Sequence, residues 1–116
     1  MHPHDQIRIR HMIEAANDAL TFAKGRQRSE LDGDRQLLLS IVKSIEIIGE
    51  AASKVSASAQ EKHTDIPWHA IITMRHRLVH GYFDIDHEVV WQTLLLDLPP
   101  LLSQLEAIMQ QSENQE

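Results

Sequence analysis

The 116-residue chain contains no cysteine. This absence excludes a disulfide framework, a thiolate metal site and a cysteine nucleophile, and it fits a protein of a reducing compartment. Residues 1–5 lack the charged-then-apolar layout of a signal peptide. No apolar run approaches the roughly 18 residues that a membrane span requires. We therefore expect a cytoplasmic protein without a membrane segment.

Aromatic residues make up only 4% of the chain, and glycine and proline number four each. A β-sheet would need more valine, tyrosine, phenylalanine and threonine, whereas the abundant residues here favour helices. A chain of this length forms one domain and buries roughly two thirds of the surface that its unfolded form exposes. The composition thus predicts a single all-α domain over residues 1–116.

The chain also lacks the positive charge of a general nucleic-acid binder, because its formal net charge is −6. Residues 1–80 hold all 11 lysines and arginines with 10 of the 17 acids, and residues 81–116 hold the other seven acids. Any contact with RNA must therefore be local. The basic residues 24–28 are one candidate, with Arg75 and Arg77 nearer the chemistry, although residues 24–28 fit a solvated loop equally well.

Four helical stretches separated by short polar breaks account for nearly the whole chain. They are predicted at residues 5–24, 32–56, 67–80 and from residue 86 onwards, each with apolar residues at three-and-four spacing. Residues 57–65 are predicted to form a loop. Short connections between four amphipathic helices indicate a mostly antiparallel four-helix bundle.

Turn and cap residues mark the ends of these stretches. Gly25 ends the first stretch and Gly81 ends the third. A short acid within residues 32–34 caps the second, and Pro67 lies in the first turn of the third. The fourth begins near Asp86.

The fourth stretch contains Pro99 and Pro100. These prolines remove the amides that would bond to the carbonyls of Leu95 and Leu96, yet the apolar phase continues across them. The pattern predicts a last helix that is kinked at Pro99-Pro100 and does not end there.

The second stretch carries more apolar residues than one bundle face can bury, since Leu37, Leu39 and Ile47 lie off its main stripe. Either this helix lies centrally in the bundle or it also makes a subunit contact. Glu50 falls at a buried helical phase beside Gly49. That position indicates a structural carboxylate paired with an arginine, and not a catalytic one.

Imidazoles are concentrated in the third stretch. On a helix, His76 and His80 are one turn apart, and His69 lies two turns earlier on nearly the same line. Histidine can take and give a proton near neutral pH, as RNA cleavage requires at the 2′-hydroxyl and at the leaving 5′-oxygen. The Arg75 guanidinium can hold the scissile phosphate and stabilise the charge of its transition state. These residue types indicate RNA cleavage.

Helix geometry limits this interpretation. Arg75 and His80 are roughly 140° apart around a straight helix, so they cannot converge on one phosphate from a regular helix. Either the last turn distorts at Gly81, or a second copy of the chain completes the site. The same residues also fit a histidine at a helix end and a surface ion pair of Arg75 with an aspartate. A metal-binding pair of His76 and His80 is disfavoured, because neither a cysteine nor a carboxylate of this helix joins them.

Several segments together resemble the HepT branch of the HEPN proteins. In chain order they are Ile45-Glu46-Ile47-Ile48-Gly49-Glu50-Ala51-Ala52, Asp65-Ile66-Pro67-Trp68, Met74-Arg75-His76-Arg77-Leu78-Val79-His80-Gly81-Tyr82 and Asp97-Leu98-Pro99. The resemblance covers nearly the whole chain. Its most specific part is R-x-x-x-x-H-x-Y after a Pro-Trp helix start.

The resemblance implies a homodimeric helical RNase toxin of a type II or type VII-like toxin-antitoxin system, active without a metal or other cofactor. It implies that the R-x-x-x-x-H motifs of two protomers face one another in a cleft, with Arg75 and His80 as the catalytic residues. His76 stands where the family commonly has asparagine. We therefore expect His76 to support the site by hydrogen bonding, together with Arg77.

The resemblance also implies a partner antitoxin, a minimal nucleotidyltransferase that transfers AMP to the tyrosine of the motif, here Tyr82. Tyr82 is two residues past His80 and directly beyond Gly81, where a modifying enzyme could reach it. The alternative role for Tyr82 is a packed aromatic side chain that anchors the turn.

A second hypothesis, of a different class, is a non-catalytic helical binding module that holds a nucleotidyltransferase partner or a nucleotide. The presence of Arg75, His80 and Tyr82 together favours the endoribonuclease. The net charge of −6 favours the binding module.

Overall fold

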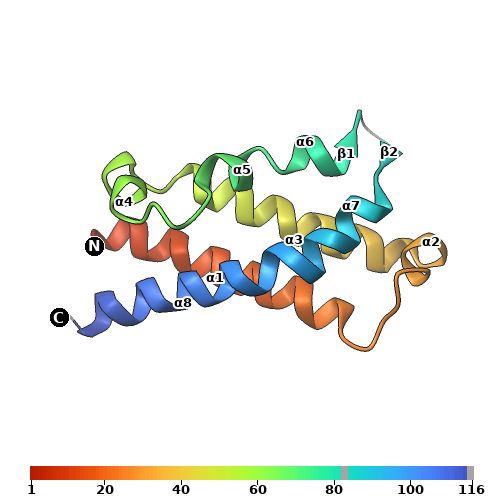
Figure 1. The fold of residues 1–116 in the computed structure, drawn as a ribbon, viewed down its shortest axis with the longest axis horizontal. Coiled ribbons are helices and arrows are strands. Elements are labelled where there is room, and N and C mark those ends of the chain that lie inside the picture. The colour runs from red at the N-terminus through yellow and green to blue at the C-terminus, as the bar shows by residue number, and fades with distance from the viewer. Residues whose placement is uncertain (82–83, 115–116) are drawn as a thin grey trace.

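In the computed structural model, which describes residues 1–81 and 84–114, three long helices form the body of the domain (Figure 1). They are α1 (Pro3–Ala23), α3 (Arg35–Ser53) and α8 (Leu98–Asn114), and α1 packs against both of the others. Short helices and one two-stranded sheet occupy the remaining length. The predicted helical class is therefore confirmed, with a small sheet in addition.

Helix α1 matches the predicted first stretch closely. It begins after His2, whose ring nitrogen Nδ1 accepts a hydrogen bond of 3.0 Å from the backbone amide of His4. It ends before Gly25, whose φ of +74° lies in the left-handed region that favours glycine. Of the predicted apolar stripe, Ile9, Met12 and Ala16 are buried, and Ile13, Leu20 and Ala23 are half-buried against the core. Ala15 and Ala19 are buried in addition.

The predicted second stretch is divided into α2 (Glu30–Gly33) and α3. Helix α3 begins after Asp34, whose carboxylate accepts a hydrogen bond of 3.0 Å from the backbone amide of Leu37. Leu37 is buried, but Leu39 and Ile47 are 43% and 41% exposed. Helix α3 therefore has a solvent-facing side that carries apolar residues, and it is not the centre of the bundle.

Residues 57–65, predicted as a loop, contain helix α4 (Ala57–Lys62). Ser56 caps this helix, because its hydroxyl accepts a hydrogen bond of 3.2 Å from the backbone amide of Ala59. Ser56 is itself held by Asp5 of α1. The Asp5 carboxylate accepts hydrogen bonds from the backbone amide of Ser56, at 2.8 Å, and from its hydroxyl, at 2.7 Å. The loop prediction was wrong because this anchor joins residues that are far apart in the sequence.

The Asp5 carboxylate is buried and charged. Burial by itself raises the pKa of Asp5, but the two hydrogen bonds from Ser56 and the nearby His2 and His4 outweigh it, so the pKa lies below its ordinary value. The ionised carboxylate therefore stabilises the folded state. This contribution is present above roughly pH 4, the range of an unfolded aspartate, and is lost as the pH falls through the folded-state pKa.

We expect Asp5→Ala to lower the free energy of unfolding by about 1–3 kcal/mol near neutral pH, because the amide of Ser56 loses its acceptor. Urea titration of the wild type and the variant measures this difference. Asp18→Ala, at an exposed acid of the same helix, is the control and should change stability by less than about 0.5 kcal/mol. The effect of Asp5→Ala should shrink at low pH. An effect that is independent of pH would mean that the ionised carboxylate is not the stabilising species.

The predicted third helix, residues 67–80, is wrong as one continuous element. Helix α5 (Trp68–Ile72) is followed by a turn, by the short helix α6 (Arg75–Leu78) and by strand β1 (Val79–His80). Strand β1 pairs antiparallel with β2 (Asp84–Ile85), with Val79 opposite Ile85 and His80 opposite Asp84. The helix thus ends before Val79, two residues earlier than predicted, and His80 lies in extended backbone.

Two local features explain this break. The hydroxyl of Thr73 donates a hydrogen bond of 2.7 Å to the carbonyl of His69, and such back-bonding bends helices. Val79 is β-branched and adopts φ −126° and ψ 120°, which suits its strand. The backbone amide of Asp86 then donates to the carbonyl of Leu78 at 2.8 Å, which closes the hairpin against α6.

The fourth stretch begins as predicted, because the Asp86 carboxylate accepts a hydrogen bond of 3.1 Å from the amide of Val89 and caps α7 (His87–Gln92). Helix α7 continues into the π-helical turn η1 (Thr93–Asp97) and then into α8. The π-helical turn ends at Asp97, two residues before Pro99, and the helix continues through both prolines as predicted. The kink at Pro99-Pro100 stays a prediction. Pro99 and Pro100 occupy the first turn of α8, where helices tolerate a missing amide.

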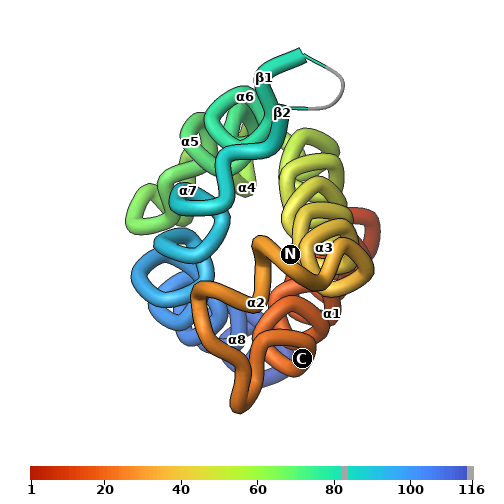
Figure 2. The backbone as a smooth tube through the Cα atoms, turned by 90° about the vertical axis from the view of Figure 1, so that its right-hand side faces the viewer, coloured from red at the N-terminus to blue at the C-terminus, as the bar shows by residue number. Residues whose placement is uncertain are grey.

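Viewed from its end, the domain has one core, which is surrounded by α1, α3, the α5–α6 pair and the segment from α7 to α8 (Figure 2). The four predicted stretches therefore do surround one core. The second and the third are broken, so the bundle is not made of four continuous helices. None of the described helices combines the length and the apolar character needed to cross a membrane. The most deeply buried large side chains come from all parts of the bundle and include Met12, Ile41, Ile45, Leu78, Leu98 and Leu105.

Candidate active site

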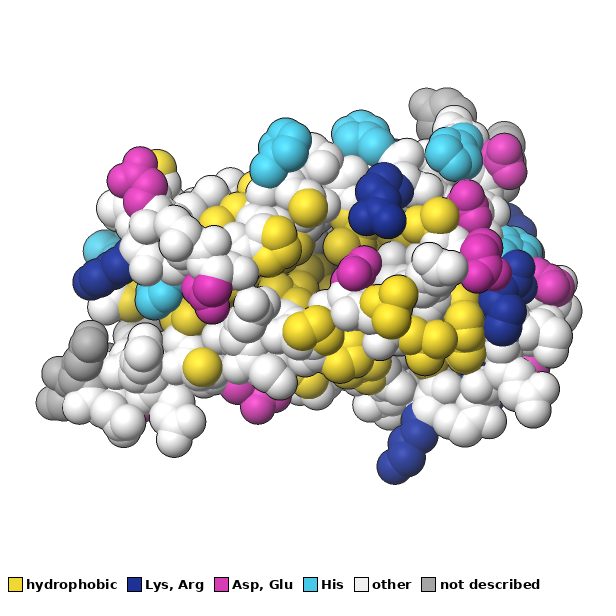
Figure 3. Space-filling model, viewed as in Figure 1, with side chains coloured by type: hydrophobic (Ala, Val, Ile, Leu, Met, Phe, Trp, Pro, Cys, Tyr) yellow, Lys and Arg dark blue, Asp and Glu magenta, His cyan; other side chains and the backbone are white. Residues whose placement is uncertain are grey.

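The segment that follows α5 turns its apolar side chains inward and its polar ones outward. Met74, Leu78 and Val79 are buried, with exposed fractions of 5%, 0% and 8%, and they fasten the segment to the core. Figure 3 shows histidine side chains along the edge of the molecule that α5, α6 and β1 form. The exposed polar side chains of this segment are those of Arg75, His76, Arg77 and His80.

The position of His80 in β1 changes the predicted geometry of the site. The angle of roughly 140° between Arg75 and His80 applies to a continuous helix, and the helix ends between them. Of the two solutions considered, distortion of the last turn is therefore present within one chain, although it begins at Val79 and not at Gly81. Within residues 1–81 and 84–114, no hydrogen bond or ion pair joins Arg75 to His80.

The same break removes the basis of a metal-binding pair, because His76 and His80 do not share a helix face. Among the described residues, no group of three or more histidine or carboxylate side chains gathers as a metal site would require.

Arg75 forms an ion pair with Glu46 of α3. The guanidinium Nε lies 3.7 Å from the carboxylate, and the side chains of Arg75 and Glu46 are 51% and 32% exposed. An ion pair of Arg75 was one of the alternatives from the sequence, but its partner is Glu46 and not an aspartate. Sequence reasoning missed Glu46, because nothing local links residues 46 and 75.

A groove of about 220 Å³ lies beside this ion pair, between α3 and α5, with Arg75 at its wall. The two helices approach closely at Gly49, where an added Cβ would lie 3.0 Å from the carbonyl oxygen of Ile71. Glycine at this position therefore permits the packing that brings Glu46 to Arg75. The prediction for the neighbouring Glu50 was wrong. Glu50 is exposed, and its ion-pair partner is Lys54 at 3.5 Å.

Two of the basic residues 24–28, Arg26 and Arg28, are engaged with acids. Arg26 donates hydrogen bonds to Asp34, at 2.7 Å, and to Glu30, at 2.8 Å, and these bonds raise the pKa of Arg26. Arg28 bonds to Asp32 at 2.9 Å and to Glu88 at 3.0 Å. These ion pairs tie α2 to α7, so the two arginines have a structural role.

Tyr82, predicted to be the modified residue, lies outside the described residues. The residue before it, Gly81, has a φ of +78°, which again favours glycine.

Comparison with known proteins identifies the family of this chain. The family profile described as "Ribonuclease HepT-like" matches residues 12–108, a range that includes α5, α6 and both strands. The chain belongs to the HepT-like ribonuclease family. The resemblance seen in the sequence is thereby confirmed.

HepT-like relatives share most of the length of this domain. A protein named "Putative RNase" from Caldanaerobacter subterraneus subsp. tengcongensis is 31% identical over 105 residues, which cover 90% of this chain and 94% of that protein. Another "Putative RNase", from Methanocaldococcus jannaschii, is 29% identical over 97 residues, or 84% of this chain and 89% of that protein. A "Probable ribonuclease HepT" from Thermococcus cleftensis is 33% identical over 75 residues, or 65% and 68% of the two chains. No solved structure gives a significant match.

Proposed function

We propose that this HepT-like protein is a metal-independent endoribonuclease toxin in which Arg75 and His80 carry out RNA cleavage. The observation that carries this proposal is the exposed edge of α6 and β1. Three buried residues anchor that edge to the core, and it presents two arginines and two imidazoles to solvent. One short segment therefore offers a cationic clamp and proton-transfer groups, and a second copy of the motif facing the first would complete the cleft around one phosphodiester.

In the proposed reaction, an imidazole removes the proton from the 2′-hydroxyl next to the scissile phosphate. The 2′-oxygen then bonds to phosphorus while the bond from phosphorus to the 5′-oxygen breaks, and the leaving 5′-oxygen receives a proton from an imidazolium. The products are a 2′,3′-cyclic phosphate and a free 5′-hydroxyl. His80 is assigned to proton transfer, and Arg75 stabilises the charge on the non-bridging oxygens. His76 and Arg77 support them with hydrogen bonds and positive charge.

The ion pair with Glu46 leaves Arg75 available for this role. Pairs between exposed side chains contribute only about 0–1 kcal/mol, because solvent screens them. A phosphate in the groove can form a bidentate, charge-assisted contact with the guanidinium, which is stronger than the contact of 3.7 Å to Glu46. RNA is therefore expected to replace Glu46 as the partner of Arg75.

The proposed active form is a homodimer, and an apolar patch next to α6 supports this. The two most exposed large hydrophobic side chains among the described residues are Leu95 and Leu96 of η1, at 57% and 66%. Pro99 and Pro100 beside them are also exposed, and α7, which leads into η1, packs against α6. Figure 3 shows hydrophobic side chains gathered below the histidine-bearing edge. A partner that covers this patch would bring a second copy of the motif close to the first.

We expect the double substitution Leu95→Glu and Leu96→Glu to convert a dimer into a 13.3 kDa monomer and to lower RNA cleavage by at least about a hundredfold. Light scattering after size exclusion measures the mass. The matched control is Ile7→Glu with Phe22→Glu, the exposed apolar pair of α1, which should leave the dimer intact. Leu39→Glu with Ile47→Glu tests the subunit contact that the sequence allowed on α3. Dissociation by the α3 pair alone would place the interface on α3, and a wild-type monomer would contradict the dimer.

The proposed system includes a minimal nucleotidyltransferase antitoxin that transfers AMP to Tyr82. The support is positional, since Tyr82 follows His80 by two residues and comes directly after Gly81. AMP at that place would add bulk and negative charge where the RNA phosphate must approach Arg75.

A further inference from the structure

A second cavity lies where α1, α4 and α8 meet, at the end of the bundle opposite the β1–β2 hairpin (Figure 1). Its volume is about 600 Å³, which falls within the range of small-molecule sites. It shares no lining residue with the groove beside Arg75. The cavity therefore needs an explanation of its own.

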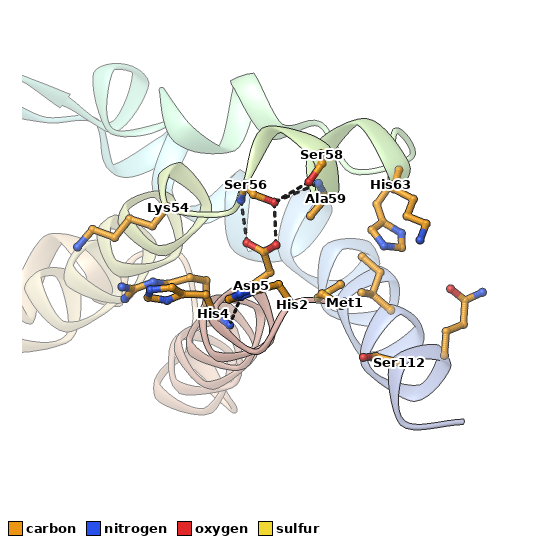
Figure 4. Close-up of a pocket in the computed structure, with 14 residues that line it drawn as sticks. Met1, His2, His4, Asp5, Lys54, Ser56, Ser58, Ala59, His63 and Ser112 are labelled. Atoms are coloured by element: carbon orange, nitrogen blue, oxygen red, sulfur yellow. Dashed lines mark hydrogen bonds between the residues drawn. The ribbon is translucent and has the colours of Figure 1, made fainter. Parts of the chain in front are cut away.

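The lining of this cavity is strongly basic. Among the described lining residues, Asp5 is the one carboxylate, and Figure 4 shows it turned onto Ser56, which occupies both of its oxygens. Its negative charge is thus directed into the wall. Six lysine, arginine and histidine side chains line the same space: His2, His4, Arg8, Lys54, Lys62 and His63.

Across the part of the chain that the structure describes, two of these cations, Arg8 and Lys62, form neither an ion pair nor a side-chain hydrogen bond. Arg26, Arg28, Lys54 and Arg75 are paired with acids. Among the described lysines and arginines without an ion pair, only Arg8 and Lys62 line this cavity. In a chain with a net charge of −6, unpaired cations around a cavity that lacks a free carboxylate indicate an anionic ligand.

The remaining lining residues include both polar and apolar ones. Ser58, Gln111 and Ser112 bring polar groups, while Ala59 and Ile108 bring apolar surface. The walls are also fixed to one another. Asp5 ties α1 to α4 through Ser56, and the side-chain amide of Gln6 donates to the hydroxyl of Ser112 at 2.7 Å, which ties α1 to α8. These contacts hold the walls in place, and the lining offers cationic, polar and apolar side chains.

We propose that this cavity binds a nucleoside phosphate, either free or as the phosphorylated end of an RNA strand. Arg8 and Lys62 hold the phosphate by charge-assisted hydrogen bonds, and the apolar wall accepts the nucleoside. Because Arg8 and Lys62 lie outside α6 and β1, this binding does not depend on the proposed cleavage. The two proposals can fail separately.

Isothermal titration of the wild type with uridine 5′-monophosphate and with uridine tests the phosphate directly. The phosphate ester should bind at least about tenfold more tightly, which is the change expected from one or two charge-assisted hydrogen bonds. The double variant Arg8→Gln with Lys62→Gln should lose this preference. Lys43→Gln, at an exposed lysine of α3 away from the cavity, is the matched control and should bind as the wild type does. Thermal unfolding of each variant verifies that it is folded.

The outcomes separate the sources of the phosphate. A short RNA that competes with uridine 5′-monophosphate only when it carries a terminal phosphate would identify an RNA end as the ligand. If no RNA competes with uridine 5′-monophosphate, the ligand is the free nucleotide. Equal binding of uridine and its monophosphate, no binding of either, or unchanged binding by the folded Arg8→Gln, Lys62→Gln variant would each overturn the proposal.

Discussion

Substitution of His80 by alanine is expected to slow RNA cleavage by about 10²- to 10⁴-fold, the usual contribution of a positioned acid or base. Arg75→Ala is expected to slow it by about 10²- to 10³-fold, because a donor to the developing phosphate charge is lost. Both side chains are exposed, and the core beneath them is formed by Met74, Leu78 and Val79. Neither substitution should therefore change the stability or the oligomeric state.

A time course with an end-labelled RNA measures these rates. The matched controls are His69→Ala, at an exposed histidine of α5, and Arg10→Ala, at an exposed arginine of α1. Both should cleave RNA at nearly the wild-type rate. An unaltered rate in His80→Ala would move the proton transfer to His76 or to another segment of the chain.

The strongest alternative to the histidine mechanism is one in which the Glu46 carboxylate takes part in cleavage, because this carboxylate is the observed partner of Arg75. If Glu46 only holds the guanidinium before RNA binds, then Glu46→Gln should retain cleavage. A loss as large as that of His80→Ala would instead make Glu46 part of the reaction. The comparison of these variants thus separates a histidine mechanism from a carboxylate mechanism.

The second large effect concerns control by the antitoxin. In the proposed modification, the phenol oxygen of Tyr82 bonds to the α-phosphorus of ATP, and pyrophosphate leaves. The AMP group would block the approach of RNA to Arg75 sterically and by charge, without unfolding the bundle. The phenol itself is not needed for cleavage. Tyr82→Phe is therefore expected to keep at least part of the RNase activity and to remain toxic when it is co-expressed with the nucleotidyltransferase.

Mass spectrometry after incubation with the nucleotidyltransferase and ATP measures this modification. AMP should be found on the peptide that contains Tyr82 in the wild type, and it should be absent from Tyr82→Phe. His80→Ala should still be modified, which makes it the control for recognition by the partner. If Tyr82→Phe were neutralised as well as the wild type, inhibition would arise from complex formation and not from AMP.

Local signals in the sequence predicted the parts of the fold that local contacts determine. The apolar stripe of α1 and its end at Gly25, and the cap of α7 by Asp86, depend on residues within one or two turns. Helix α4 was missed because its cap, Ser56, is held by Asp5 across 51 positions in the sequence. The break of the third stretch was placed too late for a related reason, since the pairing of His80 with Asp84 is not visible in a helical pattern.

In the candidate site, too, the sequence predicted what depends on neighbouring residues and missed what depends on distant ones. The residue chemistry and the family resemblance together predicted Arg75, His76, Arg77 and His80, and in the structure all four are exposed on α6 and β1. The partner of Arg75 could not be derived, because Glu46 reaches it only through the close approach of α3 and α5 at Gly49. The second cavity was also missed, since its basic residues come from separate parts of the chain that meet only after folding.

The chemistry of the cleaved RNA ends is the most direct test of the proposed mechanism. A single-stranded RNA is incubated with the purified protein in EDTA, and the new ends are analysed by mass spectrometry. The mechanism of Arg75 and His80 predicts undiminished cleavage in EDTA, with a 2′,3′-cyclic phosphate on one fragment and a 5′-hydroxyl on the other. Activity that disappears in EDTA and returns with Mg²⁺, or fragments that carry a 5′-phosphate, would contradict it.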